Sequence, residues 1–208
     1  MPTEGERTAR RGRRPRGTVR SALVDAGFEL ARSGGPDAVV LREVTRTVGV
    51  VPNAAYRHFA DRDTLLAAVR DEAVKELAGR MAAGMSQARA GPHTPTGARL
   101  RLQAVGEAYL EFARTEPGLF DTAFAAADHP AGDETEEPTP LDHLQAALDN
   151  LVSAGILASD RRPNIEYPIW ASVHGLAVLL RGPLQSLPER EKTRLESQML
   201  AFIGAAVS

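Results

Sequence analysis

Two short segments of helical character, residues 41–48 and 52–59, flank a turn that strongly restricts how this chain can fold. Gly49 lies where the chain must reverse sharply, and glycine adopts a positive φ angle without steric strain. Pro52 suits the first position of a helix, because its missing N–H would have no acceptor there. This stretch therefore predicts two helices that meet at a fixed angle through a tight turn.

The rest of the chain has helical rather than strand periodicity. Apolar residues recur at spacings of three and four, and no segment alternates β-branched and polar residues as a half-buried strand does. About nine helices are expected, so the predicted fold class is all-α. The expected units are a basic arm at 1–17, a three-helix domain at 18–62 and a larger helical domain at 63–208.

Charge is unevenly distributed along the chain, although the net charge is only −2. Residues 1–62 carry 12 Lys and Arg against 7 Asp and Glu, whereas the remainder carries 13 against 20. A basic N-terminal region on an acidic body indicates that only this region meets a polyanion. Two interpretations of the arginine-rich arm stay open, a solvated tail or an arm that enters the minor groove of DNA. Its arginines are Arg7, Arg10, Arg11, Arg13, Arg14 and Arg16.

Composition and motifs exclude several other classes of protein. The chain has no cysteine, which excludes disulfides and thiolate metal sites. Its longest apolar run, residues 169–180, is shorter than the roughly 20 residues of a membrane span, and no secretory signal is visible. We therefore expect a cytoplasmic protein without membrane contact. Because enzyme motifs and converging metal ligands are missing, with the acidic run at 133–137 interpreted as a solvated loop, no catalytic residue, metal or cofactor is expected.

The segment at 49–63, GVVPNAAYRHFADRD, combines a small apolar core with polar head groups. The residues expected to fix the angle between the two helices are Val44, Val48, Val50, Ala55 and Phe59. The residues expected to face outward are Pro52, Asn53, Ala54, Arg57 and His58. Arg and Asn side chains suit base edges in the major groove, whereas Tyr, His and Arg also bind phosphates. The pattern thus predicts double-stranded DNA as a partner, with Asn53 and Arg57 at base edges.

The sequence GGPDAVVLREVTRTVGVVPNAAYRHFADRDTLLAAV resembles the DNA-binding domain of the tetracycline-repressor (TetR) family of transcriptional regulators. The resemblance covers about residues 19–70 without a gap. It implies that Arg42 contacts a base or a phosphate. It also implies base-facing positions for Pro52, Asn53, Ala54 and Arg57. Phosphate contacts are implied for Tyr56, His58 and Arg62, the last at a position where the family often has Lys.

Three positions depart from this family pattern. Val40 and Val51 stand where a Ser or Thr N-cap is usual, and Thr45 stands where Ala is usual. Loss of a hydroxyl cap costs about 1 kcal/mol, so both short helices are expected to be softer than average without DNA. A second interpretation is that a Val51 methyl group meets a thymine methyl and changes base preference. Both interpretations stay open.

Farther along, EAYLEFARTEPGLFDTAF and WASVHGLA resemble a C-terminal ligand-binding domain of one TetR branch, named WHG for its Trp-His-Gly residues. The resemblance implies a hollow core that holds an effector, for which Ala123 is a further lining position. The pocket candidates are Tyr109, Phe112, Phe120, Phe124, Trp170 and His174. The simpler interpretation is a solid core, with His174 bonded to a backbone carbonyl and Gly175 permitting close packing. The C-terminal helices carry no cluster of charged residues that would bind an ionic ligand, so the expected effector is an apolar or amphipathic molecule.

The last two expected helices, 165–181 and 188–207, carry apolar stripes that one chain alone can hardly bury. Two copies would form an isologous four-helix interface. The predicted interface residues are Val173, Leu176, Ala177, Leu180, Leu195, Met199, Phe202 and Ile203.

The leading hypothesis is a ligand-responsive regulator, most simply a repressor, that binds a palindromic operator as a homodimer and is released by a small molecule. An activator role stays open, because the sequence does not reveal where the operator lies. The alternative is an all-helical small-molecule-binding protein without operator binding. A third hypothesis is an enzyme that uses His174 with acidic neighbours, and the lack of a nucleophile argues against it.

Overall fold

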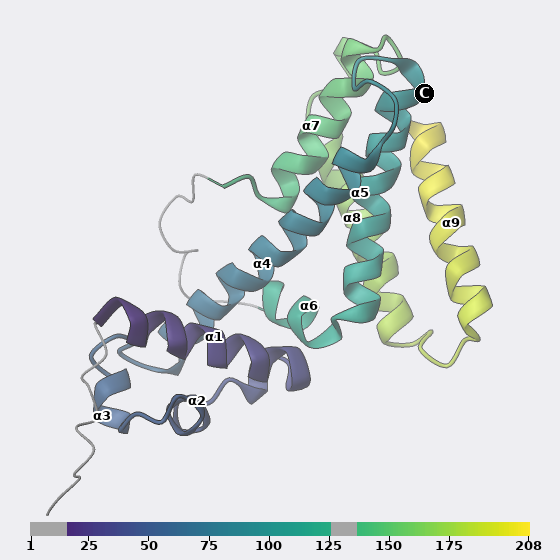
Figure 1. Ribbon diagram of the computed structural model, residues 1–208. Coiled ribbons are helices and arrows are strands. Elements are labelled where there is room, and N and C mark those ends of the chain that lie inside the picture. The colour runs from purple at the N-terminus through teal and green to yellow at the C-terminus, as the bar shows by residue number, and fades with distance from the viewer. Residues whose placement is uncertain (1–15, 126–136) are drawn as a thin grey trace, which may run out of the picture.

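The computed structural model describes residues 16–125 and 137–208, which form nine α-helices and two short 3-10 helices without any strand (Figure 1). The predicted all-α class is therefore confirmed. Most of the arginine-rich arm and most of the acidic run at 133–137 lie outside the described residues. No helix in the described ranges is long and apolar enough to cross a membrane. The elements are α1 (Arg16–Gly34), η1 (Pro36–Ala38), α2 (Leu41–Val48), α3 (Pro52–Ala55), α4 (Arg62–Gln87), α5 (Pro95–Thr115), α6 (Pro117–Ala123), α7 (Pro140–Ser153), η2 (Ser159–Arg161), α8 (Glu166–Arg181) and α9 (Glu189–Ala206).

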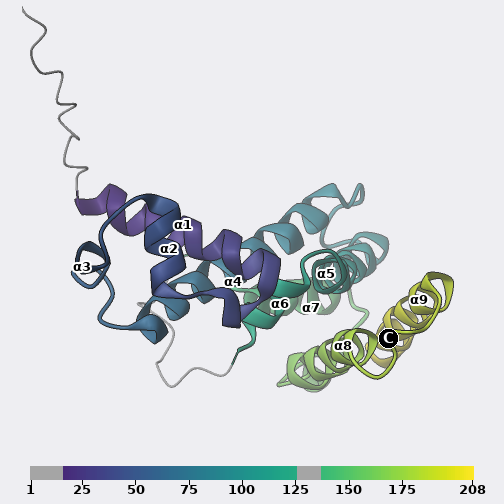
Figure 2. The ribbon, with the colours of Figure 1, turned by 90° about the horizontal axis from the view of Figure 1, so that it is seen from below.

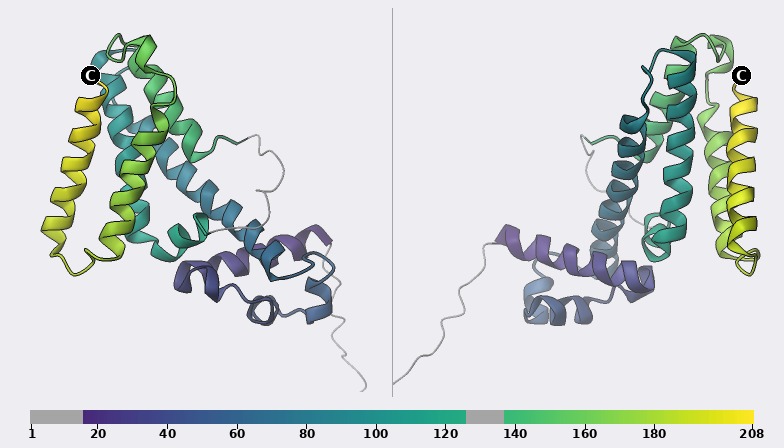
Figure 3. Two further views of the ribbon diagram at one scale, coloured as in Figure 1. Left: turned by 180° about the vertical axis from the view of Figure 1, so that it is seen from behind. Right: turned by 45° about the vertical axis from the view of Figure 1, so that its right-hand side comes forward.

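The 26-residue helix α4 joins two parts of the molecule (Figure 1). Its first turns lie with α1, α2 and α3, and its later turns lie against α5 and α7. Helices α8 and α9 lie on the side of α5 that faces away from α4 (Figures 2 and 3). The short helix α6 lies between the end of α5 and α1. A three-helix unit is thus connected to a helical bundle by one long helix and one short one.

The tight turn forms as the sequence predicts. Gly49 has a φ angle of 72°, in the left-handed region that glycine adopts readily. Val44, Ala55 and Phe59 are fully buried beneath the turn. Helix α3 is shorter than expected, since it ends at Ala55 and continues as a hydrogen-bonded turn in which the Phe59 N–H donates to the Ala55 carbonyl at 2.9 Å. The chain must change direction there, because the N-cap of α4 follows only two residues after Phe59.

Local capping signals define where most of the helices begin. Helices α3, α5, α6 and α7 each begin with proline, which needs no acceptor at that position. The Asp61 carboxylate accepts the Thr64 N–H at 2.8 Å at the start of α4. Thr139 forms a full capping box at α7. By contrast, Val40 and Val51 provide no side-chain cap for α2 and α3, which confirms that both helices lack the usual hydroxyl.

Helix α6 packs against the C-terminal end of α1 at very short range. A Cβ atom on Gly118 would overlap the carbonyl oxygens of Ala31 and Arg32, so only glycine fits without a shift of the backbone. The Glu116 carboxylate lies 2.9 Å from Arg80 of α4 and 3.7 Å from Arg32 of α1. The close backbone contact and the shared carboxylate fix the three-helix unit to the bundle.

The faces of α8 and α9 differ from those predicted. The single chain buries most of the predicted interface stripe: Val173, Leu176, Ala177, Leu180 and Ile203. The expectation that one chain can hardly bury these residues is therefore wrong, because the stripe faces α5 and the bundle core. Leu195 and Met199 are half-buried, and Phe202 is 65% exposed. The large apolar side chains that α8 leaves exposed are Tyr167, Val178 and Leu179.

Candidate nucleic-acid interface and ligand cavity

Helix α2, the turn and α3 form a surface at the end of the molecule remote from α9 (Figures 1 and 2). The predicted DNA-contacting residues that are exposed there are Arg42, Val51, Pro52, Asn53, Tyr56 and Arg57. Ala54 and His58 are half-buried. Because Ala55 and Phe59 are buried directly beneath, the exposed side chains project from a packed base rather than from a mobile loop.

The exposed arginines of this surface differ in their partners. Arg46 forms an ion pair with Glu43 of the same helix at 2.8 Å. Arg42 and Arg57 have no ion-pair partner within residues 16–125 and 137–208. A guanidinium group without an acceptor on its own chain can donate to a phosphate or to guanine without breaking an existing bond. The structure thus presents Arg42 and Arg57 as cations suited to nucleic acid.

Arg62 does not project with them. Its Nε donates to the Val39 carbonyl at 2.9 Å, and its Nη2 donates to the Pro36 carbonyl at 2.6 Å. Its Nη1 lies 3.6 Å from the Asp63 carboxylate. Two of its five N–H donors are thus held by carbonyl groups of the same chain. Arg62 instead ties the first turn of α4 to the segment that precedes α2, and so positions the reading helices.

Three aromatic residues meet at one hydroxyl group inside the bundle. The Trp170 indole N–H donates to the Tyr109 oxygen at 3.2 Å, and that oxygen lies 2.8 Å from Nδ1 of His174. The indole can only donate, so His174 is the partner of this hydroxyl that can accept its proton. We therefore assign the Tyr109 proton to the bond with Nδ1 and the imidazole proton to Nε2. His174 therefore bonds a side chain and not the expected backbone carbonyl. A Cβ on Gly175 would meet no atom within 4 Å, so close packing does not explain this glycine.

Burial keeps this cluster neutral. It lowers the pKa of His174 below its usual value and raises the pKa of the Tyr109 hydroxyl. A neutral imidazole is the form that accepts the Tyr109 proton, so the hydrogen bonds and the pKa directions agree. No group of three metal-ligating side chains gathers anywhere in the described ranges.

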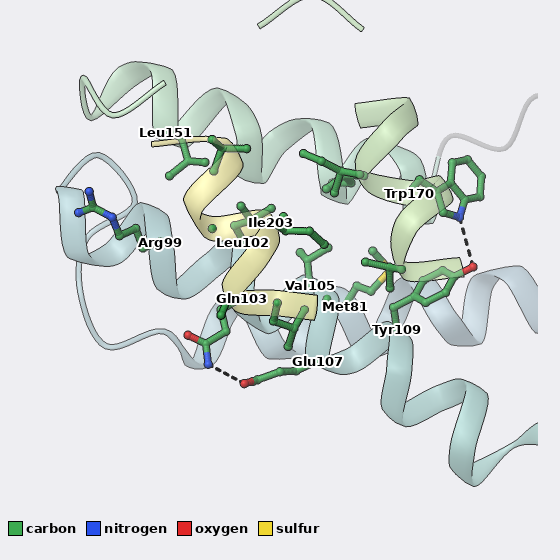
Figure 4. A pocket seen from close by; sticks show the side chains of 18 of the residues that line it. Met81, Arg99, Leu102, Gln103, Val105, Glu107, Tyr109, Leu151, Trp170 and Ile203 are labelled. Carbon is green, nitrogen blue, oxygen red and sulfur yellow. Dashed lines mark hydrogen bonds between the residues drawn. The ribbon is translucent and has the colours of Figure 1, made fainter. Parts of the chain in front are cut away.

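A cavity of about 420 Å³ lies beside this cluster, among α5, α7, α8 and α9 (Figure 4). Met81 closes it from α4. Of the predicted pocket residues, Tyr109 and Trp170 line the cavity. Its volume is within the range of small-molecule sites in proteins. The bundle therefore contains a cavity large enough for a small molecule, and two of the predicted pocket residues border it.

The other pocket candidates pack solidly next to the cavity. Phe120 stacks on His174 with 5.5 Å between ring centroids, and Phe124 lies 4.9 Å from both rings. Phe112 is fully buried, with the Arg80 guanidinium 5.2 Å from its ring centre. Phe112, Phe120, Phe124, His174 and Ala123 do not line this cavity. They fill space because aromatic rings attract one another edge to face.

Sequence reasoning missed the aliphatic wall of the cavity. Leu102, Val105, Leu144 and Leu151 line it from α5 and α7. Helix α9 contributes residues between Ser197 and Ala205, and Val207 and Ser208 follow from the chain after it. The only signal for these residues was ordinary apolar spacing, which a solid core would produce equally well.

Comparison with known proteins covers both parts of the chain. Residues 23–69 match the family described as bacterial regulatory proteins, tetR family, and residues 102–202 match the Tetracyclin repressor-like, C-terminal domain. Over 56 residues the chain is 45% identical to an uncharacterized HTH-type transcriptional regulator of Haemophilus influenzae. That match covers 26% of this chain and only 27% of the relative.

Solved structures share the fold over nearly the whole chain. A protein with unknown function from Rhodococcus sp. RHA1 has a TM-score of 0.64 at 23% identity, covering 94% of this chain and 98% of that one. A TetR-family transcriptional regulator from Pectobacterium atrosepticum has a TM-score of 0.63 at 21% identity, covering 95% and 96%. The two family matches together span more than half of the sequence, one on each part of the fold. The chain therefore belongs to the TetR family of helix-turn-helix transcriptional regulators, a family of DNA-binding proteins that are not enzymes.

Proposed function

We propose that this regulator is a repressor that binds a palindromic operator as a homodimer and leaves it when a small molecule binds the C-terminal bundle. The observation that carries the DNA half of the proposal is the exposed surface of α2 and α3. There Arg57, without an ion-pair partner among the described residues, lies on a packed base close to Asn53. A cytoplasmic location follows from this role.

Each exposed residue of this surface has a distinct proposed contact. Asn53 and Arg57 read base edges, for which their amide and guanidinium groups suit adenine and guanine. Tyr56 and His58 bind phosphates, and Arg42 binds a phosphate or a base. Val51 is 68% exposed and apolar, which suits contact with a thymine methyl group. Pro52 and Ala54 lie beside the bases and limit how closely the backbone approaches.

The proposed homodimer uses the outer faces of α8 and α9. Phe202 on α9 and Val178 on α8 are 65% and 47% exposed, and neither has an apolar partner that covers it. Three residues before Val178 on α8, Gly175 leaves open space into which a side chain of the second copy could pack. The predicted residues that the chain already buries, such as Val173, then support this face from below. A two-fold axis through it makes the operator a near-palindrome.

The proposed release acts through the elements that join the two parts of the molecule. Arg62 ties α4 to the segment before α2, and Gly118 brings α6 onto α1. An effector that prefers one arrangement of the bundle would thereby change how far apart the two reading surfaces lie. We also infer that the C-terminal domain is of the WHG type, since Trp170 and His174 meet at the hydroxyl of Tyr109.

The test is footprinting on the DNA upstream of the regulator's own gene and the adjacent gene, followed by binding with two variants. Arg57→Ala should weaken binding by about 1–3 kcal/mol and relax preference at one base pair. Arg46→Ala is the matched control, because Arg46 is exposed on the same surface but is paired with Glu43. Failure to bind any promoter fragment at low salt would favour the alternative, a helical small-molecule-binding protein.

A further inference from the structure

The interior of the cavity has walls of one chemical kind. Its buried lining is mostly aliphatic, as shown by Leu102, Val105, Leu144, Leu151, Val173 and Ile203. No charged side chain belongs to the buried part of the lining within the described residues. An ionised ligand group placed there would lose its hydration without gaining a partner, which is strongly unfavourable.

The polar atoms of the wall are already occupied. The Trp170 N–H donates to Tyr109, and the Tyr109 proton is directed to His174 outside the cavity. Figure 4 shows the first of these bonds at one side of the cavity. The wall therefore offers a ligand no free N–H or O–H donor at this point. A ligand gains affinity here by apolar contact and not by hydrogen bonds.

Two helix edges form a mouth to this cavity. On α5, exposed Arg99, Gln103 and Glu107 follow one another at intervals of four residues. On α9, the exposed small residues Ser197, Ala201 and Ala205 have the same spacing. Residues four apart lie on one face of a helix. The mouth thus has a polar edge on α5 and a small-residue edge on α9, with its charges in solvent.

We propose that this cavity binds a neutral, largely apolar small molecule that enters between α5 and α9. The charged side chains at the mouth are exposed and contribute little to binding, because solvent screens them. The further statement that such a molecule is the effector rests on the proposed function. Binding itself does not.

The binding test uses the full chain and simple probes of known chemistry. 1-Hexanol, 1-octanol and 1-decanol are titrated by calorimetry. Each buried methylene should tighten binding about fourfold, so the dissociation constant should fall by about fifteenfold per step. Decanoate and decylammonium should bind at least about tenfold more weakly than 1-decanol, because each brings a charge into the wall. Equal or tighter binding of decanoate, lost in Arg99→Gln, would overturn neutrality and indicate a carboxylate held at the mouth.

A pair of glycine substitutions locates the site. Gly204 lines the cavity, and a Cβ on it would meet no atom within 4 Å, so Gly204→Phe adds a ring where there is room. This variant should weaken 1-decanol binding by at least about tenfold. Gly79→Phe, at an equally open and exposed position on α4 outside this cavity, should bind as the parent does. Ala201→Trp at the mouth is a second blocking variant, in case Gly204→Phe does not fold.

Operator binding, measured without any alcohol, separates this inference from the proposed function. Unchanged 1-decanol binding in Gly204→Phe and Ala201→Trp would overturn the site. If the parent chain binds no operator fragment, the proposed function is overturned, and the result on cavity binding is unaffected. A lower operator affinity with 1-decanol in the parent, absent in Gly204→Phe, would support both.

Discussion

The helix-turn-helix and the C-terminal bundle differ in where their candidate binding groups lie. In the first they are on the outer surface, and in the second they surround an internal cavity. Around the turn, buried Ala55 and Phe59 form a solid base, and polar groups such as Arg57 point into solvent. In the bundle, polar groups such as Tyr109 and His174 bond to one another, and apolar side chains face an internal space. One region is built to contact a large, charged partner, and the other to enclose a small one.

The two regions also differ in how densely their apolar side chains are packed. Val44, Ala55 and Phe59, beneath the turn, are packed on every side, which keeps the outward residues fixed in position. Side chains that line the cavity lack neighbours on one side and so gain less from packing. The bundle therefore lacks van der Waals contacts at the cavity, and a bound ligand would supply them.

The largest expected effect compares two leucines of equal burial. Leu23, in the core of the three-helix unit, and Leu151, at the cavity, both have no exposed surface. Leu23→Ala should lower the free energy of unfolding by about 2–5 kcal/mol, with Leu151→Ala near the lower limit, because Leu151 already faces empty space. Chemical denaturation measures both. Equal losses would show that the bundle is as solid as the three-helix unit.

A second pair of variants tests the contact between the two regions. Gly118→Ala should lower stability by about 1–3 kcal/mol, since the added methyl group forces α6 away from α1. Gly79→Ala should stabilise the exposed helix by up to about 1 kcal/mol, as alanine is the better helix former. Thermal unfolding and operator titration report on both. A Gly118→Ala protein with the parent's stability would disprove the close contact.

The role of Arg62 can be distinguished from that of a DNA contact by salt dependence. Arg62→Ala should weaken operator binding by about 1 kcal/mol on every sequence, because the segment before α2 loses two hydrogen bonds to a partly exposed guanidinium. The slope of affinity against salt concentration should stay unchanged. If the slope fell by about one unit, Arg62 would be a phosphate contact after all.

The smallest expected effect is a dependence of stability on pH. Burial lowers the pKa of His174 in the folded chain, so the unfolded chain binds its proton more readily. The stabilisation is present above the unfolded pKa near 6.5 and declines as the pH falls toward the folded value. Melting temperatures between pH 7.5 and 5 should fall less steeply in His174→Gln than in the parent. Parallel curves would show that His174 does not titrate in this range.

Local signals in the sequence were enough to predict the helix-turn-helix. Gly49, Pro52 and Asp61 act on the backbone within a few residues, so their effects did not depend on distant packing. The outward positions of Pro52, Asn53 and Arg57 followed from the same signals, whereas Arg42 was placed by the family resemblance. The position of the Arg62 side chain could not be predicted in this way. Its acceptors are the backbone carbonyl groups of Pro36 and Val39, and because every residue has such a group, the sequence does not indicate which ones Arg62 reaches.

Where the cavity lies depends on how five helices pack, and no local pattern encodes that. Phe120 and a lining residue such as Leu102 have the same apolar periodicity, yet one fills space and the other borders it. The faces of α8 were also ambiguous, because that helix is apolar on most of its circumference. Only the position of α5 decides that Val173 is buried and Val178 is exposed.

The contact at Gly118 gives the molecule a lever. Side chains in contact can accommodate a small displacement by changing rotamer. The backbone of Gly118 and the carbonyl groups of Ala31 and Arg32 cannot, so a shift of α6 is passed to α1. Helix α1 has 19 residues and extends from this contact toward α3 (Figure 1). The part of it from Ala31 back to Arg16 is about 22 Å long at 1.5 Å per residue, so turning it by about 5° at the contact moves its far end by about 2 Å. A shift of α6 too small to disturb the bundle is thereby magnified at the end of α1 that lies nearest the DNA-reading surface.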